Sequence, residues 1–176
     1  EPFWKFDDKD SQNRKNDFKS IVVACSKLGI SMIIIPLVDN GSINSKDQQF
    51  KFIEFMNENE NFFIKNSVRI IFESDFGPQE LALFMENFSK NIFGVNYDTG
   101  NSASMNFNIA EEFNCYGNLI VNVHLKDRLV NGPTVKFGSG NTDFLSVFKF
   151  LSEIKYNGNL IIQGARSDNG KHYDIL

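Results

Sequence analysis

The sequence has only two cysteines, no excess of basic residues and no long apolar run. Cys25 and Cys115 lie in separate segments without a CxxC spacing, which argues against a disulfide scaffold and favours a reducing compartment. The longest apolar runs, such as residues 31–38, are too short to cross a bilayer, and the first residues lack the basic and then apolar pattern of a signal peptide. These absences predict a cytoplasmic protein with no membrane partner.

The charge balance argues against a general nucleic-acid binder. The chain carries 18 lysines and arginines against 22 aspartates and glutamates, a formal net charge of −4, and the two signs are interspersed. We therefore expect no nucleic-acid partner, because a phosphate backbone is bound by clustered basic side chains. The 176 residues suffice for one domain with a substantial core, and 19 phenylalanines make that core unusually aromatic.

Strand and helix patterns alternate along the chain after a predicted loop at residues 1–11. Apolar residues recur at helical spacing at residues 10–28, 46–59, 78–88, 109–115 and 143–154. Short apolar runs predict strands at residues 31–38, 68–72, 92–98, 119–125 and 159–162, of which the first is continuous enough to be covered on both faces. Strands that alternate with helices imply βαβ crossovers, so the predicted fold class is α/β with a parallel sheet.

Polar residues end each predicted strand, where ligands of such sheets usually bind. In chain order they are Asp39, Glu73, Asp98, His124 and Gln163. Glu73, Asp98 and His124 together make a plausible set of ligands for a divalent metal. Taken singly, each has a simpler reading, because a carboxylate at a strand end is often a helix N-cap and a single histidine is often a core or surface residue. Three such residues on successive strands favour function.

Five motifs at the strand ends resemble, in order, those of the sugar phosphate isomerase/epimerase family, which are xylose isomerase-like TIM barrels. They are FESDF, VNYDTGNSAS, NVHLKDR, FGSGNTDF and IIQGAR. The resemblance implies a (β/α)8 barrel that binds a small-molecule sugar or sugar phosphate and one divalent metal, Mn, Mg, Co or Zn. It also implies the metal ligands, which by motif are Glu73, Asp98, His124 and, at the fourth position, Gln163.

The fourth ligand position departs from the family pattern. Epimerases of this type use two glutamates to exchange a proton beside a carbonyl through an enediolate, and a glutamine cannot act as a base. The resemblance therefore leaves Glu73 as the catalytic base, with Lys126 or Asp127 as its helper. Two alternatives stay open, a sugar-binding relative without catalysis and a polyol dehydratase of the same superfamily. An endonuclease of the wider superfamily is disfavoured, since the chain has only two histidines.

The chain also departs from the family in length. Counted by its motifs, it covers about the last five βα units, so residues 1–176 are expected to be the C-terminal part of a single barrel domain whose first three units are absent. An open sheet of this kind would expose apolar edge strands, which favours a partner or a homo-oligomer. We therefore expect the chain alone to need a partner or to be inactive.

The remaining polar residues offer candidate contacts to substrate. Gly138 and Gly140 could present backbone N–H groups to an anion, or could form only a tight turn before a helix. Arg166 could bind a phosphate or carboxylate through its planar fork, whereas Arg128 fits better as a salt-bridge residue on the rim. Asn101 could bind a substrate hydroxyl or simply occupy a left-handed turn position.

Overall fold

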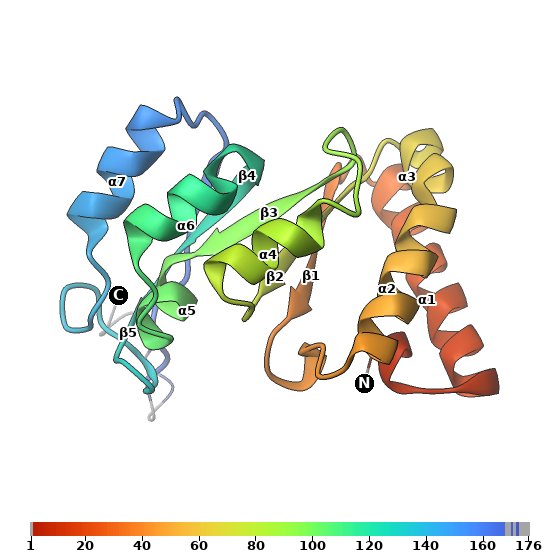
Figure 1. The fold of residues 1–176 in the computed structure, drawn as a ribbon, viewed down its shortest axis with the longest axis horizontal. Helices are drawn as coiled ribbons and strands as arrows, with labels where there is room; N and C mark the ends of the chain where they lie inside the picture. The colour runs from red at the N-terminus through yellow and green to blue at the C-terminus, as the bar shows by residue number, and fades with distance from the viewer. Residues whose placement is uncertain (1, 168–169, 171, 173–176) are drawn as a thin grey trace. The chain divides into compact units, whose positions relative to one another are not determined.

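The computed structural model describes residues 2–167, 170 and 172, and it is built around five strands with helices on the connections (Figure 1). The strands are β1 (Met32–Leu37), β2 (Arg69–Ser74), β3 (Phe93–Asp98), β4 (Ile120–Leu125) and β7 (Asn159–Ile162). The helices are α1 (Asp8–Lys27), α2 (Lys46–Glu58), α3 (Glu60–Asn66), α4 (Pro78–Met85), α5 (Thr99–Ser104), α6 (Ile109–Tyr116) and α7 (Phe144–Glu153).

The sheet follows the order β1-β2-β3-β4-β7, with β1 and β7 at its two ends. The pairs β1/β2, β3/β4 and β4/β7 are parallel, as the alternation of strands and helices predicts. Register places Asp98 of β3 opposite His124 of β4, so two of the polar strand ends lie at the same level. The α/β class and the parallel sheet are confirmed.

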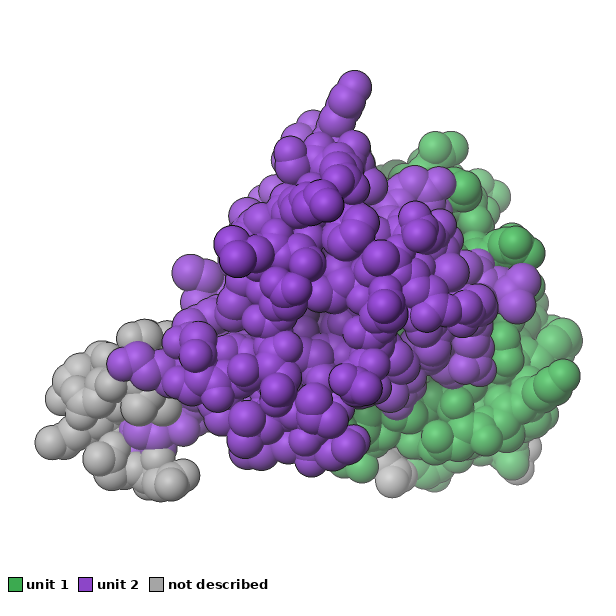
Figure 2. Space-filling view, turned by 60° about the vertical axis from the view of Figure 1, so that its left-hand side comes forward, with its two compact units in different colours: residues 1–74, 84–94 green, residues 75–83, 95–176 purple. Residues whose placement is uncertain are grey.

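The chain divides into two compact units, coloured separately in Figure 2. The first comprises residues 1–74 and 84–94, and its core is aromatic. Phe72 has no exposed surface and lies at ring-centroid distances of 5.2 Å from Phe52, 5.1 Å from Phe88 and 5.8 Å from Phe93. These contacts account for part of the high phenylalanine content.

The second unit comprises residues 75–83 and 95–176. Phe113 of α6 packs against Tyr97 of β3 at 5.2 Å and against Phe150 of α7 at 5.4 Å, which fixes two helices on the strands of this unit. The apolar residues of β7 remain exposed, with Ile162 at 66%. This agrees with the expectation that the sheet ends in an apolar edge strand.

Several elements differ from the sequence predictions. Helix α1 begins at Asp8, inside the predicted loop, and three short elements were not predicted: α3, α5 and the hairpin of β5 (Asp127–Arg128) with β6 (Thr134–Val135). The prediction that residues 31–38 are covered on both faces is wrong. Pro36 is exposed and Ile33 and Ile34 are half-buried, because β1 ends the described sheet and lacks a neighbour on one side.

Within the described residues, none of the helices combines the length and the apolar composition needed to cross a bilayer.

Candidate metal and substrate site

Asp98 ends β3 and begins α5. Its side chain is 1% exposed, and its Oδ1 accepts hydrogen bonds from the N–H groups of Gly100 and Asn101, each at 2.9 Å. Asp98 therefore serves as the N-cap of α5, which is the simpler reading of a carboxylate at a strand end. This cap uses only Oδ1, so Oδ2 faces the other polar groups at the strand ends.

Lys126 lies beside the second oxygen of Asp98. Its Nζ is 2.7 Å from Asp98 Oδ2, while its N–H donates to Thr99 Oγ1 and its carbonyl accepts from the same hydroxyl. The Lys126 stem crosses Gly100 so closely that a Cβ there would come within 2.8 Å of it. Glycine at position 100 thus lets the lysine reach Asp98.

His124 is held by a buried row of carboxamides. Its Nδ1 lies 3.9 Å from Asp98 Oδ2 and 3.1 Å from Asn96 Nδ2, and Asn96 Oδ1 accepts a 2.6 Å hydrogen bond from Asn122 Nδ2. Sequence analysis did not identify either asparagine. Their signal is periodic, since Asn96 and Asn122 precede Asp98 and His124 by two residues and therefore lie on the same face of their strands.

Glu73, Asp98 and His124 form a group that could hold a metal ion. Each offers one ligand atom, and these atoms all lie within 4.8 Å of one another. The three residues are 9%, 4% and 8% exposed. Two carboxylates and an imidazole suit a divalent cation, and burying the carboxylates is less costly when a cation neutralises them. The donor set therefore fits the predicted metal.

Gln163 and Arg166 share a cavity with Lys126. The cavity has a volume of about 460 Å³ and is also lined by Thr134 and Gly164. Gln163 follows β7, and its N–H donates to the carbonyl of Leu125 at 2.9 Å. The structure thus brings the predicted fourth ligand together with the predicted base helper and the predicted anion-binding arginine.

The loop of Gly138 and Gly140 holds an internal anion. Their N–H groups donate to Asp127 Oδ2 at 2.8 and 2.9 Å, and the N–H of Thr142 donates to Oδ1 at 3.1 Å. Burial alone would raise the pKa of Asp127, but these donors outweigh it and lower that pKa. The two glycine N–H groups are occupied by Asp127, which itself is committed to the loop and not to the strand-end cluster.

Asn101 and Arg128 bind each other. Arg128 Nη1 donates to Asn101 Oδ1 at 2.8 Å, and its Nε and Nη2 donate to the carbonyl of Gly132. The predicted salt bridge of Arg128 is thus replaced by neutral acceptors, which tie α5 to the β5–β6 hairpin.

Glu112 lies in a buried cluster behind Asp98 that sequence analysis missed. Its carboxylate, 2% exposed, accepts hydrogen bonds from the hydroxyls of Ser102 at 2.5 Å, Tyr97 at 3.1 Å and Tyr116 at 2.7 Å. The cluster joins β3, α5 and α6. The only indication in the sequence was that Glu112 occupies a position on the apolar face of α6.

The cluster predicts a pH-dependent stability. Burial raises the pKa of Glu112 above its ordinary value of 4.5, although the three hydroxyl donors lower it in part. A carboxyl group whose pKa is higher in the folded state than in the unfolded state stabilises the folded state. This contribution is complete at pH values below the unfolded-state pKa, and it is lost as the pH rises through the folded-state pKa. We expect the free energy of unfolding of the wild type, relative to Glu112→Gln, to fall as pH rises from 4.5 to neutrality.

Urea unfolding at a series of pH values measures this difference. Glu86→Gln, which removes an exposed carboxyl, is the control and should show no such trend. A difference between wild type and Glu112→Gln that stays constant with pH would show that Glu112 does not titrate in this range.

Comparison with known proteins places this chain in a family. The sequence model of the family described as "Xylose isomerase-like TIM barrel" matches residues 2–173. None of the curated proteins matches significantly.

Solved structures share the fold. A xylose isomerase domain protein from Planctomyces limnophilus has a TM-score of 0.74 at 20% identity, over 87% of this chain and 59% of that one. A D-psicose 3-epimerase from Clostridium cellulolyticum H10, solved with D-tagatose, has a TM-score of 0.75 at 18% identity, over 99% and 65%. The IOLI protein, solved with a zinc atom, has a TM-score of 0.73 at 19% identity, over 89% and 62%.

The chain thus spans less than two thirds of the length of each of these three structures. The fold is accordingly part of a barrel, with five of its strands in the described sheet. On the family match over residues 2–173, the chain belongs to the xylose isomerase-like TIM barrel family.

Proposed function

We propose that the protein is a metal-dependent isomerase or epimerase of a sugar or sugar phosphate. The observation that carries the proposal is the group of Glu73, Asp98 and His124, whose ligand atoms lie within 4.8 Å of one another. The family match and the structural likeness to sugar epimerases support it. Glu73, Asp98 and His124 would hold the ion, with the carbonyl oxygen of Gln163 as a fourth ligand.

A bound divalent cation would act as a Lewis acid that polarises the sugar carbonyl. Glu73 takes the proton from the carbon beside the carbonyl, and the electron pair of that bond moves to the carbonyl oxygen to give an enediolate. The ammonium group of Lys126, held 2.7 Å from Asp98 Oδ2, supplies positive charge next to this oxygen. Glu73 then delivers the proton to the former carbonyl carbon, while the proton of the neighbouring hydroxyl moves to the former carbonyl oxygen, so that the carbonyl is now on the neighbouring carbon.

Gln163 limits the chemistry to a single carboxylate base. Removal and return of a proton on one face of the sugar needs only Glu73, whereas inversion at carbon needs a second acid on the opposite face. A one-base isomerisation therefore fits the residues better than a two-base epimerisation. The non-catalytic sugar-binding relative and the polyol dehydratase remain the competing proposals.

Substrate contacts are proposed for Arg166 and Asn101. Arg166 is exposed and shares the cavity of Gln163 and Lys126, so its guanidinium can bind a phosphate or a hydroxyl of the substrate. Asn101 lies on α5 three residues after Asp98, and its carbonyl oxygen accepts a hydrogen bond from Arg128, so a substrate hydroxyl that binds here would lie beside this pair. The N–H groups of Gly138 and Gly140 could bind a substrate only if their hydrogen bonds to Asp127 were broken.

We also propose that residues 1–176 contribute about the last five βα units of one barrel domain. The order of the five motifs and the coverage of 59% to 65% of related chains support this. The metal set lies at the carboxyl ends of the strands, where barrel enzymes carry their sites.

Solvent deuterium exchange tests the proposed function. The full-length protein with Mn²⁺ should introduce deuterium beside the carbonyl of a ketose substrate in D₂O. Glu73→Gln, which removes the base, should slow this exchange by about 100-fold or more. The exposed Glu80→Gln is the matched control and should exchange at the wild-type rate.

A wild-type protein that binds sugar and metal without exchanging any proton would contradict an enolising enzyme. That result would favour the non-catalytic relative.

A further inference from the structure

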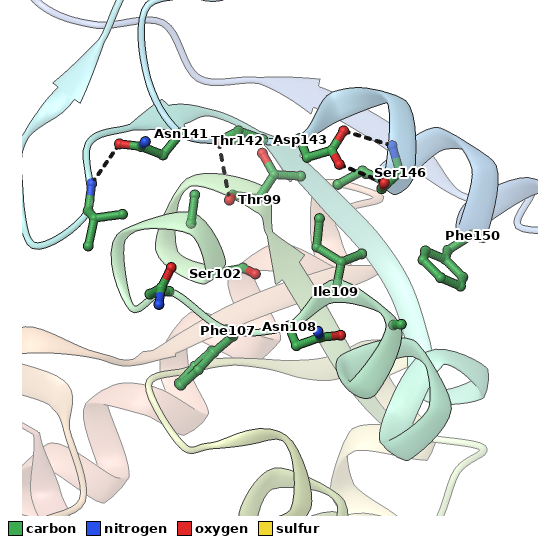
Figure 3. A pocket seen from close by; sticks show the side chains of 15 residues that line it. Thr99, Ser102, Phe107, Asn108, Ile109, Asn141, Thr142, Asp143, Ser146 and Phe150 are labelled. Carbon is green, nitrogen blue, oxygen red and sulfur yellow. Dashed lines mark hydrogen bonds between the residues drawn. The ribbon is translucent and has the colours of Figure 1, made fainter.

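A second pocket lies on the other face of the helix that Asp98 caps. Its volume is about 430 Å³, within the range of small-molecule sites. Figure 3 shows Thr99 and Ser102 of α5 on one side, and the α7 residues Ser146 and Phe150 on the other. This pocket is separate from the strand-end cluster, because Gly100 of α5 faces Lys126 while Ser102 and Ala103 line the pocket.

Small side chains keep this space open. Thr99, Ser102 and Ala103 are spaced three and four residues apart, so they present one face of α5. Ser146 and Val147 face them from α7. A larger residue on either face would fill the gap between the helices, so the size of the pocket is determined by the sequence.

Two carboxamides add hydrogen-bond donors to the pocket. Asn108 Oδ1 accepts from the N–H of Glu111 at 3.1 Å, and Asn141 Oδ1 accepts from the N–H of Val130 at 3.0 Å. Because a backbone N–H can only donate, these bonds fix the orientation of both carboxamides and leave their NH2 groups available. Both asparagines are exposed at the edge of the pocket.

The pocket offers no positive charge to an anionic ligand. Asp143 is the only charged residue among those that line it, and its two oxygens are bound by the N–H and the hydroxyl of Ser146 at 3.0 and 2.6 Å. Phe107 and Phe150 add apolar surface, and the Phe150 ring is held against Phe113. Fixed donors beside aromatic surface suit a neutral ligand that has both oxygen acceptors and C–H surface.

We propose that this pocket binds a neutral polyhydroxylated molecule of monosaccharide or disaccharide size. The proposal does not depend on the proposed function, since it uses no residue of the strand-end cluster. A ligand here contacts α5, the helix whose first N–H groups hold Asp98.

A titration with methyl α-D-glucopyranoside, followed by amide NMR shifts, tests the site. This glycoside has no free carbonyl, so it cannot be a substrate of an enolising enzyme. We expect saturable shifts in the residues that line the pocket, with a dissociation constant on the order of 1–10 mM.

Two variants and one control separate the proposed site from nonspecific effects. Ala103→Leu fills the space, and Asn108→Ser removes the NH2 group but keeps a side-chain oxygen as the cap of α6. Each should weaken binding by about tenfold or more, which corresponds to about 1.4 kcal/mol. Ala24→Leu on the exposed face of α1 should bind as the wild type does.

Three results would overturn the proposal. They are the absence of saturable shifts up to about 100 mM glycoside, equal binding by both pocket variants, and shifts confined to Glu73, Asp98 and His124. Metal binding measured on the same samples reports on the proposed function independently.

Discussion

Asp98→Ala is expected to abolish divalent-metal binding and to loosen the start of α5. The substitution removes one of three clustered ligands, and we expect the affinity to fall by more than about 100-fold, since even the loss of an outer partner of a ligand costs 10–100-fold. It also removes the two hydrogen bonds that cap α5, at a cost of about 0.5–2 kcal/mol of stability. Isothermal titration with Mn²⁺ measures the first effect, and urea unfolding the second.

Asp98→Asn separates the two roles. Asparagine keeps a side-chain oxygen for the N–H groups of Gly100 and Asn101 but removes the charge that pairs with Lys126 and that a metal needs. The cap of α5 should therefore persist while metal binding is lost. Asp143→Asn is the matched control, because Asp143 caps α7 in the same way outside the cluster. Wild-type metal affinity in Asp98→Asn would contradict the role of Asp98 as a ligand.

Phe72→Ala is expected to destabilise the protein by about 3–5 kcal/mol, the usual cost of emptying a buried aromatic site. Phe72 has no exposed surface and contacts Phe52, Phe84, Phe88 and Phe93, so these rings cannot close the cavity without moving together. The midpoint of urea unfolding measures the loss.

Phe50→Ala is the control for this core variant. Phe50 is 64% exposed on α2, and its removal should change stability by less than about 0.5 kcal/mol. Equal effects of the two substitutions would show that the cluster around Phe72 is not the core of its unit.

The regular elements could be predicted because their patterns are strong. The run of residues 159–162 gave β7 with its observed bounds, and Pro78 marked the start of α4. Short elements could not be predicted. Helix α5 has six residues and is itself formed by the turn-like sequence TGNSAS, so its formation depends on the cap by Asp98 and on packing rather than on periodicity.

Only the candidate metal ligands of the site could be predicted, and not the residues that hold them in place. Glu73, Asp98 and His124 were found because parallel strands bring their carboxyl ends to one edge. Asn96 and Asn122 were missed because polar residues inside an apolar strand carry no motif of their own, although their spacing of two from Asp98 and His124 assigns them to the same face.

The loop at Gly138 and Gly140 shows a different limit of sequence reasoning. A glycine-rich turn before a helix indicates that N–H groups are available, but it does not indicate which anion they bind. Here Asp127, which follows Lys126 directly, occupies them. An internal carboxylate fifteen or fewer residues away competes with any substrate for such a loop.

The central claim is that Glu73, Asp98 and His124 hold one divalent metal ion. The most direct test is the anomalous difference density of Mn²⁺ in crystals grown with that ion. We predict one peak within coordination distance of side-chain atoms of all three residues. A well-ordered site without such a peak at saturating Mn²⁺, or a peak bound only by other residues, would contradict the claim.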